Sequence, residues 1–339
     1  MKSGQKLRVG LVGYGYWGPN LARNFSSNAD CELVRIAEKS QERFEVAKQA
    51  HPSVDVVTDS SQITSASDID AVVIATPVHT HFALALEALD NGKHVWVEKP
   101  ITSSHEEALK LVQKADDTGL VVMVDHTFLF TGAVKKMKEI IDSGELGDLH
   151  YYDSVRVNLG LFQSDINVIW DLAPHDLSIM DYLIDKDPIS VTANGSDHYG
   201  RNLIDVGYVT VNYENNLIAH FHVNWLSPVK IRRTLVGGSK SSLVWDDLRA
   251  DSNIMIYDRG VEIETKEGMY DLLASYRMGD MRSPMIGVRE ALAEEVSYFV
   301  DCIRRNEQPF NDAAAGARVV KILEAANRSL EGHGVPITL

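Results

Sequence analysis

The first third of the chain alternates short apolar runs with longer segments in which apolar residues recur at helical spacing. Short runs rich in valine and isoleucine are typical of strands buried in a parallel sheet. Strands that alternate with helices predict parallel crossovers and an α/β, doubly wound sheet. The predicted strands are Leu7–Val12, Glu32–Ala37, Ala71–Ala75, His94–Val97 and Val121–Val124, and the predicted helices are Pro19–Ser26, Gln41–Gln49, Thr80–Asn91 and Ser103–Thr118.

Two of these helices carry end signals. Ser103 and Ser104 can each accept a hydrogen bond from a free N–H group of the first turn, so either can serve as an N-cap. Gly92 and Gly119 follow the last apolar positions, where glycine readily adopts the left-handed conformation that ends a helix. The sequence therefore predicts where the crossover helices begin and end.

Beyond about residue 125 the periodicity changes to strict alternation, which is typical of strands with one buried face. A hairpin is predicted within 206–225, turning at Glu214–Asn216. We therefore predict a Rossmann domain over residues 1–125 and an α+β domain with a large open, mainly antiparallel sheet over residues 126–339. The predicted elements of this second part are a helix at Gly132–Ser143, strands at Tyr151–Asn158, Ile189–Ser196, Val206–Tyr213, Ile218–Trp225, Arg232–Gly237 and Ser241–Asp246, and helices at Glu290–Arg305 and Asp312–Leu330.

The composition of the chain disfavours several classes of protein. The 339 residues include 48 acidic and 33 basic side chains, a formal charge of −15, which disfavours a nucleic-acid partner. With 45% hydrophobic residues the chain can build a full core. Two cysteines exclude a disulfide scaffold and fit a reducing compartment. No signal-peptide pattern and no apolar run of about 18 residues is present, so we expect a cytoplasmic protein without a membrane partner.

The clearest chemical motif is the glycine-rich run Gly13–Gly18, which directly follows the first predicted strand. Gly13 permits a tight turn, Gly15 lets backbone N–H groups approach a pyrophosphate, and Gly18 lets the following helix pack on the strand. Glu38 lies 20 positions after Gly18 at the end of the second predicted strand, where a carboxylate can accept both hydroxyls of an adenine ribose. This pattern predicts a dinucleotide site.

Glu38 favours NAD over NADP, because its charge would repel a 2′-phosphate. Lys39 and Ser40 follow immediately, so NADP stays open. His220 and His222 share one strand face, and a histidine pair without a third ligand predicts no metal site.

Two further segments carry candidate catalytic groups. Lys99 ends the strand at His94–Val97, and ligands of open α/β sheets bind beyond the carboxyl ends of strands. Asp171 and His175 are four residues apart, which places both on one face of a helix if one runs through them. Such a histidine can take a hydroxyl proton while the aspartate holds its ring. A surface lysine and a structural histidine are the alternative interpretations.

Together these motifs resemble the Gfo/Idh/MocA oxidoreductases over essentially the whole chain, because Thr76-Pro77 with His81, Glu98-Lys99-Pro100 and the Asp171/His175 pair follow the family's order and spacing. The resemblance implies Lys99 and His175 as catalytic residues, assisted by Asp171. It also implies Thr76 and Pro77 beside the nicotinamide, Glu98 on its ribose, and a second-domain sheet that mediates oligomerisation. The candidate cofactor-binding residues are Gly13, Gly15, Tyr16, Trp17, Gly18, Glu38, Thr76, Pro77, His81, Glu98 and Lys99.

The substrate class rests on the same resemblance. The segment 124–130 lacks the arginine that many relatives carry, whereas 171–176 and 276–280 look like the branch near sugar-nucleotide dehydrogenases. Arg277 and Arg282 can each bind a carboxylate or phosphate through two hydrogen bonds, or lie in a solvated loop. We expect a sugar or nucleotide-sugar dehydrogenase that forms a homodimer or homotetramer. A cyclitol or free-sugar dehydrogenase and a non-catalytic NAD-binding sensor are the alternatives.

Overall fold

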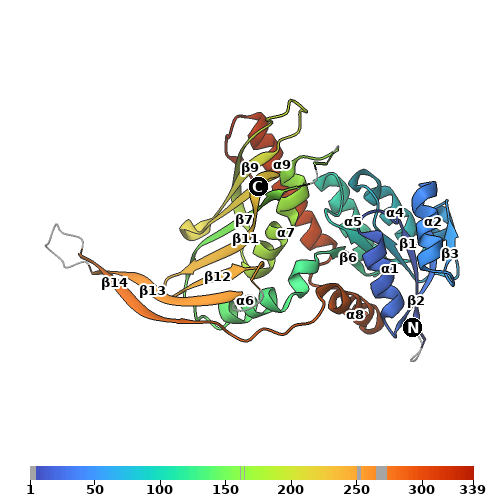
Figure 1. The fold of residues 1–339 in the computed structure, drawn as a ribbon, viewed down its shortest axis with the longest axis horizontal. Helices are drawn as coiled ribbons and strands as arrows, with labels where there is room; N and C mark the ends of the chain where they lie inside the picture. Colours follow the sequence, from blue (N-terminus) through green and yellow to red (C-terminus); the bar gives the residue numbers. More distant parts are fainter. Residues whose placement is uncertain (1–4, 161, 164, 250–252, 265–272) are drawn as a thin grey trace. The chain divides into compact units, whose positions relative to one another are not determined.

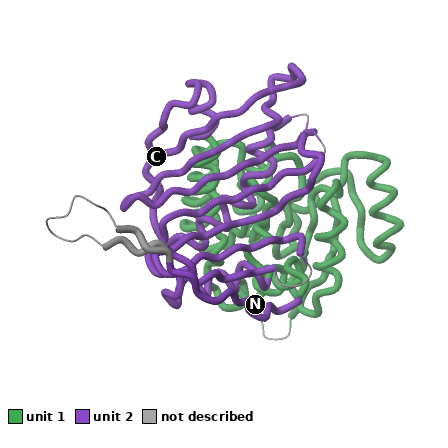
Figure 2. Tube along the Cα trace, turned by 60° about the vertical axis from the view of Figure 1, so that its left-hand side comes forward, with its two compact units in different colours: residues 1–131, 289–324 green, residues 132–288, 325–339 purple. Residues whose placement is uncertain are grey.

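The computed structural model describes residues 5–160, 162–163, 165–249, 253–264 and 273–339 (Figure 1). Its described residues form two compact units (Figure 2). The first contains residues 1–131 and 289–324, and the second contains residues 132–288 and 325–339. The predicted domain boundary lies after residue 125, with everything beyond it in the second domain. Residues 289–324 instead belong to the first compact unit.

The first unit is built on a six-stranded parallel sheet in the order β3-β2-β1-β4-β5-β6. This order starts from a central β1 and runs outward in both directions, which confirms the doubly wound Rossmann sheet. Its strands are β1 (Leu7–Val12), β2 (Cys31–Ala37), β3 (Asp55–Val57), β4 (Ala71–Ile74), β5 (His94–Glu98) and β6 (Val122–Asp125). The helices that follow in the chain are α1 (Gly18–Ser27), α2 (Gln41–Ala50), α3 (Ser61–Thr64), α4 (His81–Asp90) and α5 (His105–Thr118).

The end signals predicted for α4 and α5 are present. Ser104 caps α5 by accepting a hydrogen bond from the Glu107 N–H at 3.2 Å. Gly119 ends the same helix with φ of 67°, and Gly92 follows α4 with φ of 71°. Both glycines adopt the left-handed conformation that costs other residues energy.

An amphipathic helix from the C-terminal part of the chain completes the core of this unit. α8 (Ala291–Arg305) buries Leu292, Val296, Phe299 and Val300. The ring of Phe299 packs edge-on against Trp96 of β5, with centroids 5.5 Å apart, and Phe25 of α1 meets the same Trp96 at 5.3 Å. Burial of these large rings explains why residues 289–324 join the first sheet.

The second unit contains a nine-stranded, mostly antiparallel sheet in the order β14-β13-β12-β11-β7-β10-β9-β8-β15. The prediction of an open, mainly antiparallel sheet is confirmed; β7 and β10 form its parallel pair. Its strands are β7 (Leu149–Leu159), β8 (Pro188–Ser196), β9 (Val206–Tyr213), β10 (Ile218–Asn224), β11 (Leu226–Gly238), β12 (Ser242–Asp246), β13 (Ile254–Glu264), β14 (Leu273–Arg282) and β15 (Ile337–Thr338), and its helices include α6 (Gly132–Asp142) and α7 (Val168–Leu183). The helix α9 (Ala313–Glu331) contributes residues to both units.

The predicted hairpin is confirmed, because β9 and β10 pair antiparallel across Glu214–Asn216. Asn215 and Asn216 both have positive φ, at 58° and 61°, as tight hairpin turns require. The sequence analysis missed the hairpin of β13 and β14, whose segments are rich in charged residues and do not alternate cleanly. Arg277 and Arg282 therefore lie on a strand and not in a loop.

Candidate active site

The glycine-rich segment makes the tight strand-to-helix turn that the sequence predicted. Gly13 has φ of 97°, and a Cβ atom there would lie 2.5 Å from the carbonyl oxygen of Ala75. A Cβ on Gly18 would lie 2.7 Å from the carbonyl oxygen of Gly13. At Gly15 a Cβ would meet only the tip of the Arg43 side chain, at 2.8 Å. The turn therefore needs Gly13 and Gly18, while at Gly15 the neighbouring atoms belong to the end of a flexible arginine side chain.

Glu38 lies beside this loop at the end of β2. Its Oε2 accepts a hydrogen bond from the Tyr14 N–H at 2.6 Å, and its Oε1 accepts one from the Ser40 N–H at 2.8 Å. These two bonds hold the carboxylate in place, and each oxygen keeps a further lone pair for a ligand hydroxyl. The glycine loop and the adjoining fixed carboxylate together fit the pyrophosphate and ribose of NAD.

Tyr16 and Trp17 have different environments within the loop. The Tyr16 side chain is 84% exposed and stacks on Trp17 with ring centroids 6.4 Å apart. The Trp17 Nε1–H donates a hydrogen bond to Asp125 Oδ2 at 3.1 Å, at the end of β6. Trp17 thus connects the glycine loop to a buried carboxylate, a contact that the sequence analysis did not predict.

His81 requires a correction. It was expected to contact the cofactor, but its side chain is 1% exposed. Its Nε2 lies 2.7 Å from the carbonyl oxygen of Thr76, and its Nδ1 lies 2.9 Å from that of Pro100. Burial lowers the pKa of His81. Because both ring nitrogens contact the chain's own carbonyl groups, His81 holds the segments after β4 and β5 together.

The neighbouring Thr76 and Pro77 form the short turn between β4 and α4. The Thr76 and Thr80 hydroxyl oxygens are 2.6 Å apart, and the Thr80 hydroxyl donates to the Pro77 carbonyl at 2.7 Å. The turn therefore lies at the carboxyl end of β4, the side on which ligands of such sheets bind.

Glu98 and Lys99 end β5 on the same side of the sheet, and the peptide bond between Lys99 and Pro100 is cis. Both side chains are half-buried. Removal from water and the adjoining Asp125 carboxyl raise the pKa of Glu98 well above its ordinary value. Glu98 therefore meets another carboxyl group at the end of β6, and its contact with a ribose stays a prediction.

Asp171 and His175 lie in the second unit, one turn apart on α7, so the helix expected through them is present. Both side chains are half-buried. The Trp225 Nε1–H donates to Asp171 Oδ2 at 3.0 Å, and Asn167 caps the helix by accepting from the N–H groups of Ile169 and Trp170. The catalytic assignment of Lys99, Asp171 and His175 stays a prediction.

A buried ion pair fastens this helix to the sheet. Asp176, the residue after His175, receives two hydrogen bonds from Arg156 of β7, at 2.7 Å and 3.0 Å. Both side chains are only 5% exposed. Two parallel bonds between a guanidinium and a carboxylate fix orientation as well as distance. The pair therefore fastens α7 to β7 at the residue next to His175.

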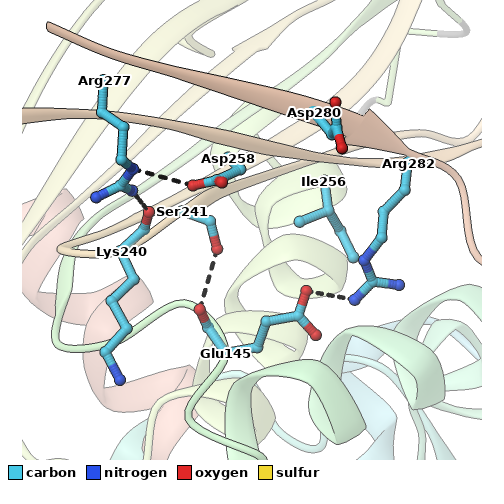
Figure 3. A pocket seen from close by; sticks show the side chains of 8 residues that line it. All are labelled: Glu145, Lys240, Ser241, Ile256, Asp258, Arg277, Asp280 and Arg282. Atoms are coloured by element: carbon cyan, nitrogen blue, oxygen red, sulfur yellow. Dashed lines mark hydrogen bonds and ion pairs between the residues drawn. The ribbon is translucent and has the colours of Figure 1, made fainter.

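Arg277 and Arg282 line a cavity of about 510 Å³ in the second unit (Figure 3). Arg277 Nε donates to Asp258 at 3.0 Å, and Arg282 pairs with Glu145. The two arginines do meet carboxylates, but those carboxylates belong to the chain itself. Neither arginine therefore supports recognition of a nucleotide phosphate.

Sequence reasoning missed Trp225, Asp125 and Glu295. A buried indole N–H needs an acceptor, so the sequence indicated that Trp225 has a hydrogen-bond partner, although the identity of the partner depends on tertiary structure.

Among the described residues no group of three or more His, Cys, Asp or Glu side chains is arranged to hold a metal ion. No helix in the described part of the chain is long and apolar enough to span a membrane.

Comparison with known proteins places the chain in a family. Residues 7–126 match the oxidoreductase family with an NAD-binding Rossmann fold, and residues 134–244 match the GFO/IDH/MocA C-terminal domain. The two matches together span more than half of the chain.

Individual relatives agree with this assignment. The chain is 24% identical to scyllo-inositol 2-dehydrogenase (NAD(+)) of Bacillus subtilis, covering 98% of this chain and 96% of the relative. It is 28% identical to UDP-N-acetylglucosamine 3-dehydrogenase of Acidithiobacillus ferrooxidans, covering 93% and 94%. A solved structure of the latter enzyme superposes with a TM-score of 0.80 at 24% identity, covering 97% and 99%. The chain therefore belongs to the Gfo/Idh/MocA family of NAD(P)-dependent oxidoreductases.

Proposed function

We propose that this enzyme transfers a hydride between a ring hydroxyl or ketone of a sugar or nucleotide-sugar and NAD, with Lys99, Asp171 and His175 as catalytic residues. The observation that carries the proposal is the pair on α7, where the indole of Trp225 holds Asp171 one turn from His175. Lys99 adds a cation at the carboxyl end of β5, within the unit that carries the glycine loop.

Each residue has a distinct role in the oxidation direction. A ring nitrogen of His175 takes the proton of the substrate hydroxyl. Asp171 holds the imidazole in the orientation that this transfer needs. The Lys99 ammonium holds the same oxygen and stabilises the negative charge that develops on it. NAD, which the glycine loop and Glu38 would hold, would supply the hydride acceptor for the carbon that carries this oxygen. Ketone reduction uses the same groups in reverse.

A cyclitol is the second candidate substrate class. It is favoured by the similarity to the Bacillus subtilis relative, which is named for scyllo-inositol. The internal pairing of Arg277 and Arg282 also removes one argument for a nucleotide phosphate. Formation of NADH with a panel of UDP-sugars, free sugars and inositols distinguishes the classes. A panel without any turnover, by a protein that binds NAD, would contradict the proposed activity.

NAD is expected to bind more tightly than NADP, by on the order of 1–3 kcal/mol, because a 2′-phosphate would approach the fixed Glu38 carboxylate. Isothermal titration calorimetry with both dinucleotides measures the difference. Glu38→Gln should reduce the preference, whereas Glu42→Gln, an exposed change on α2, should leave it unchanged. Tighter binding of NADP by the unaltered protein would overturn this prediction and would implicate Lys39 and the Ser40 hydroxyl as phosphate ligands.

A homodimer or homotetramer is expected, packed through the outer face of the nine-stranded sheet. Tyr208 and Ile218 on this face are each 42% exposed. The face is more polar than the sequence analysis expected, because His220 hydrogen-bonds Asp153 and His222 stacks on Tyr208. Light scattering at micromolar concentration measures the mass.

Two matched variants test the interface. Each replaces an exposed apolar residue with aspartate, one in the second unit and one in the first. Ile218→Asp should lower the mass by burying a charge at the interface, whereas Leu109→Asp, at an exposed site on α5, should not. A monomeric mass for the unaltered protein would rule out the assembly.

A further inference from the structure

Three carboxyl groups meet in the first unit, at the carboxyl ends of β5 and β6. Asp125 is 2% exposed and Glu295 of α8 is fully buried. Glu98 is half-buried, but its Oε1 atom is out of contact with solvent. Glu98 and Asp125 are paired residues of the neighbouring strands β5 and β6, and Glu295 Oε1 accepts a hydrogen bond from the N–H of His126, the residue after Asp125. Full ionisation of three such closely spaced carboxyl groups is unfavourable, because the charges repel one another and burial removes their hydration.

The carboxyl oxygens of the cluster differ in the hydrogen-bond donors that they meet. Asp125 Oδ2 accepts from the Trp17 Nε1–H and its Oδ1 accepts from the Thr127 hydroxyl, so each of its oxygens has a donor. Glu295 Oε1 accepts from the His126 N–H at 3.1 Å and from Asn311 Nδ2 at 3.2 Å.

One carboxyl oxygen of each glutamate has a different environment. Glu295 Oε2 and Glu98 Oε1 are buried and have no hydrogen-bond donor among the described residues. A buried acceptor without a donor is costly, whereas a protonated oxygen becomes a donor itself.

We propose that Glu98, Asp125 and Glu295 form a proton-sharing network with a single negative charge, in which both glutamates stay protonated and Asp125 positions Trp17 of the glycine loop. The network goes beyond the proposed reaction and does not depend on the identity of the substrate. The network carries one negative charge rather than three, which limits its electrostatic attraction for the adjacent Lys99 ammonium. Glu98 and Glu295 thus act through Asp125 and Lys99 as positioning residues.

The electrostatic surroundings agree with this assignment. Burial and the neighbouring Asp125 raise the pKa of Glu295 well above its ordinary value, as they do for Glu98. Lys99 at the end of β5 and His126 after β6 are titratable groups beside the network. Burial, with the charge of Lys99, lowers the pKa of His126 to about 3, so its imidazole is neutral.

Protonation of the folded state makes stability depend on pH. An unfolded chain releases these protons above the ordinary glutamate pKa of about 4.3. Because the folded pKa is raised, this contribution to stability is complete below the unfolded value and is lost as pH rises through the folded one. At neutral pH the unaltered protein should therefore release protons when it unfolds.

The first experiment counts the protons released on unfolding at neutral pH, with a pH indicator in weak buffer. Glu295→Gln keeps the shape and a donor, and should reduce the release by about one proton. Asp301→Asn is the matched control, an exposed carboxylate on the same helix, and should not change the count. An unchanged count for Glu295→Gln would overturn the proposal. If that variant does not fold, the infrared band of protonated carboxyl groups in the unaltered native protein decides; its absence would overturn the proposal equally.

The second experiment tests the link to the cofactor loop through NAD dissociation constants. Trp17→Phe removes the indole donor, and Asp125→Asn removes the charge that it contacts. Each change should weaken NAD binding by about tenfold, the size expected for a hydrogen bond to a charged group. The double variant should be little weaker than either single one, because both remove the same contact. Effects that multiply in the double variant would show that Asp125 does not act through Trp17.

Discussion

Replacing Lys99 or His175 with alanine is expected to lower kcat/KM by roughly 10²–10⁴-fold, the usual scale for a charge stabiliser or a positioned proton-transfer group. The affinity for NAD should change little, because the glycine loop and Glu38 supply the cofactor contacts. Asp171→Asn should be milder than His175→Ala, since an amide oxygen can still accept from Trp225. Steady-state rates on the identified substrate, with NAD binding measured by calorimetry, provide the test.

Matched variants separate catalysis from stability. His150 is an exposed histidine of the second unit and Lys48 is an exposed lysine of the first, so alanine at either position should leave kcat/KM unchanged. If His175 served only structure, its loss would lower the melting temperature and preserve the rate per folded molecule. Near-normal turnover by a well-folded His175→Ala protein would refute the catalytic assignment.

Asp176→Ala is expected to lower the free energy of unfolding by about 3–5 kcal/mol, because it leaves the buried Arg156 guanidinium without its counter-charge. The two groups form a bidentate pair at 2.7 Å and 3.0 Å, and each is 5% exposed. Chemical denaturation followed by circular dichroism measures the loss. Asp185→Ala, an exposed change just after α7, is the control and should have almost no effect.

The same pair offers a second, sharper comparison. Replacing both partners by apolar residues, as in Arg156→Met with Asp176→Leu, should recover most of the stability, because neither charge is then buried alone. Recovery of stability without full recovery of kcat/KM would show that the pair also orients His175 through α7. A loss below about 1 kcal/mol for Asp176→Ala, which is typical of solvent-exposed pairs, would contradict the role of the pair as a buried anchor.

Most of the first unit could be predicted from sequence because its information is local. Short apolar strands, helical periodicity, the capping Ser104 and the C-terminal Gly119 each act within a few residues, and each is confirmed in the structure. The glycines of the loop are equally local, since a turn with φ of 97° at Gly13 excludes most other residues. The hairpin of β13 and β14 was missed because its charged strands lack the alternation that marks a half-buried sheet.

The sequence by itself determined the fold class, the cofactor loop with Glu38, and the helical spacing of Asp171 and His175, because these depend on residues close together in the chain. Tertiary structure alone decided that His81 is buried between two carbonyl groups, that Arg277 and Arg282 pair with the chain's own carboxylates, and that Glu295 joins Asp125. Such contacts connect residues far apart in sequence, and no local pattern records them. Whether a histidine serves a ligand or the core, and whether a carboxyl holds its proton, is set by the groups that folding brings beside it.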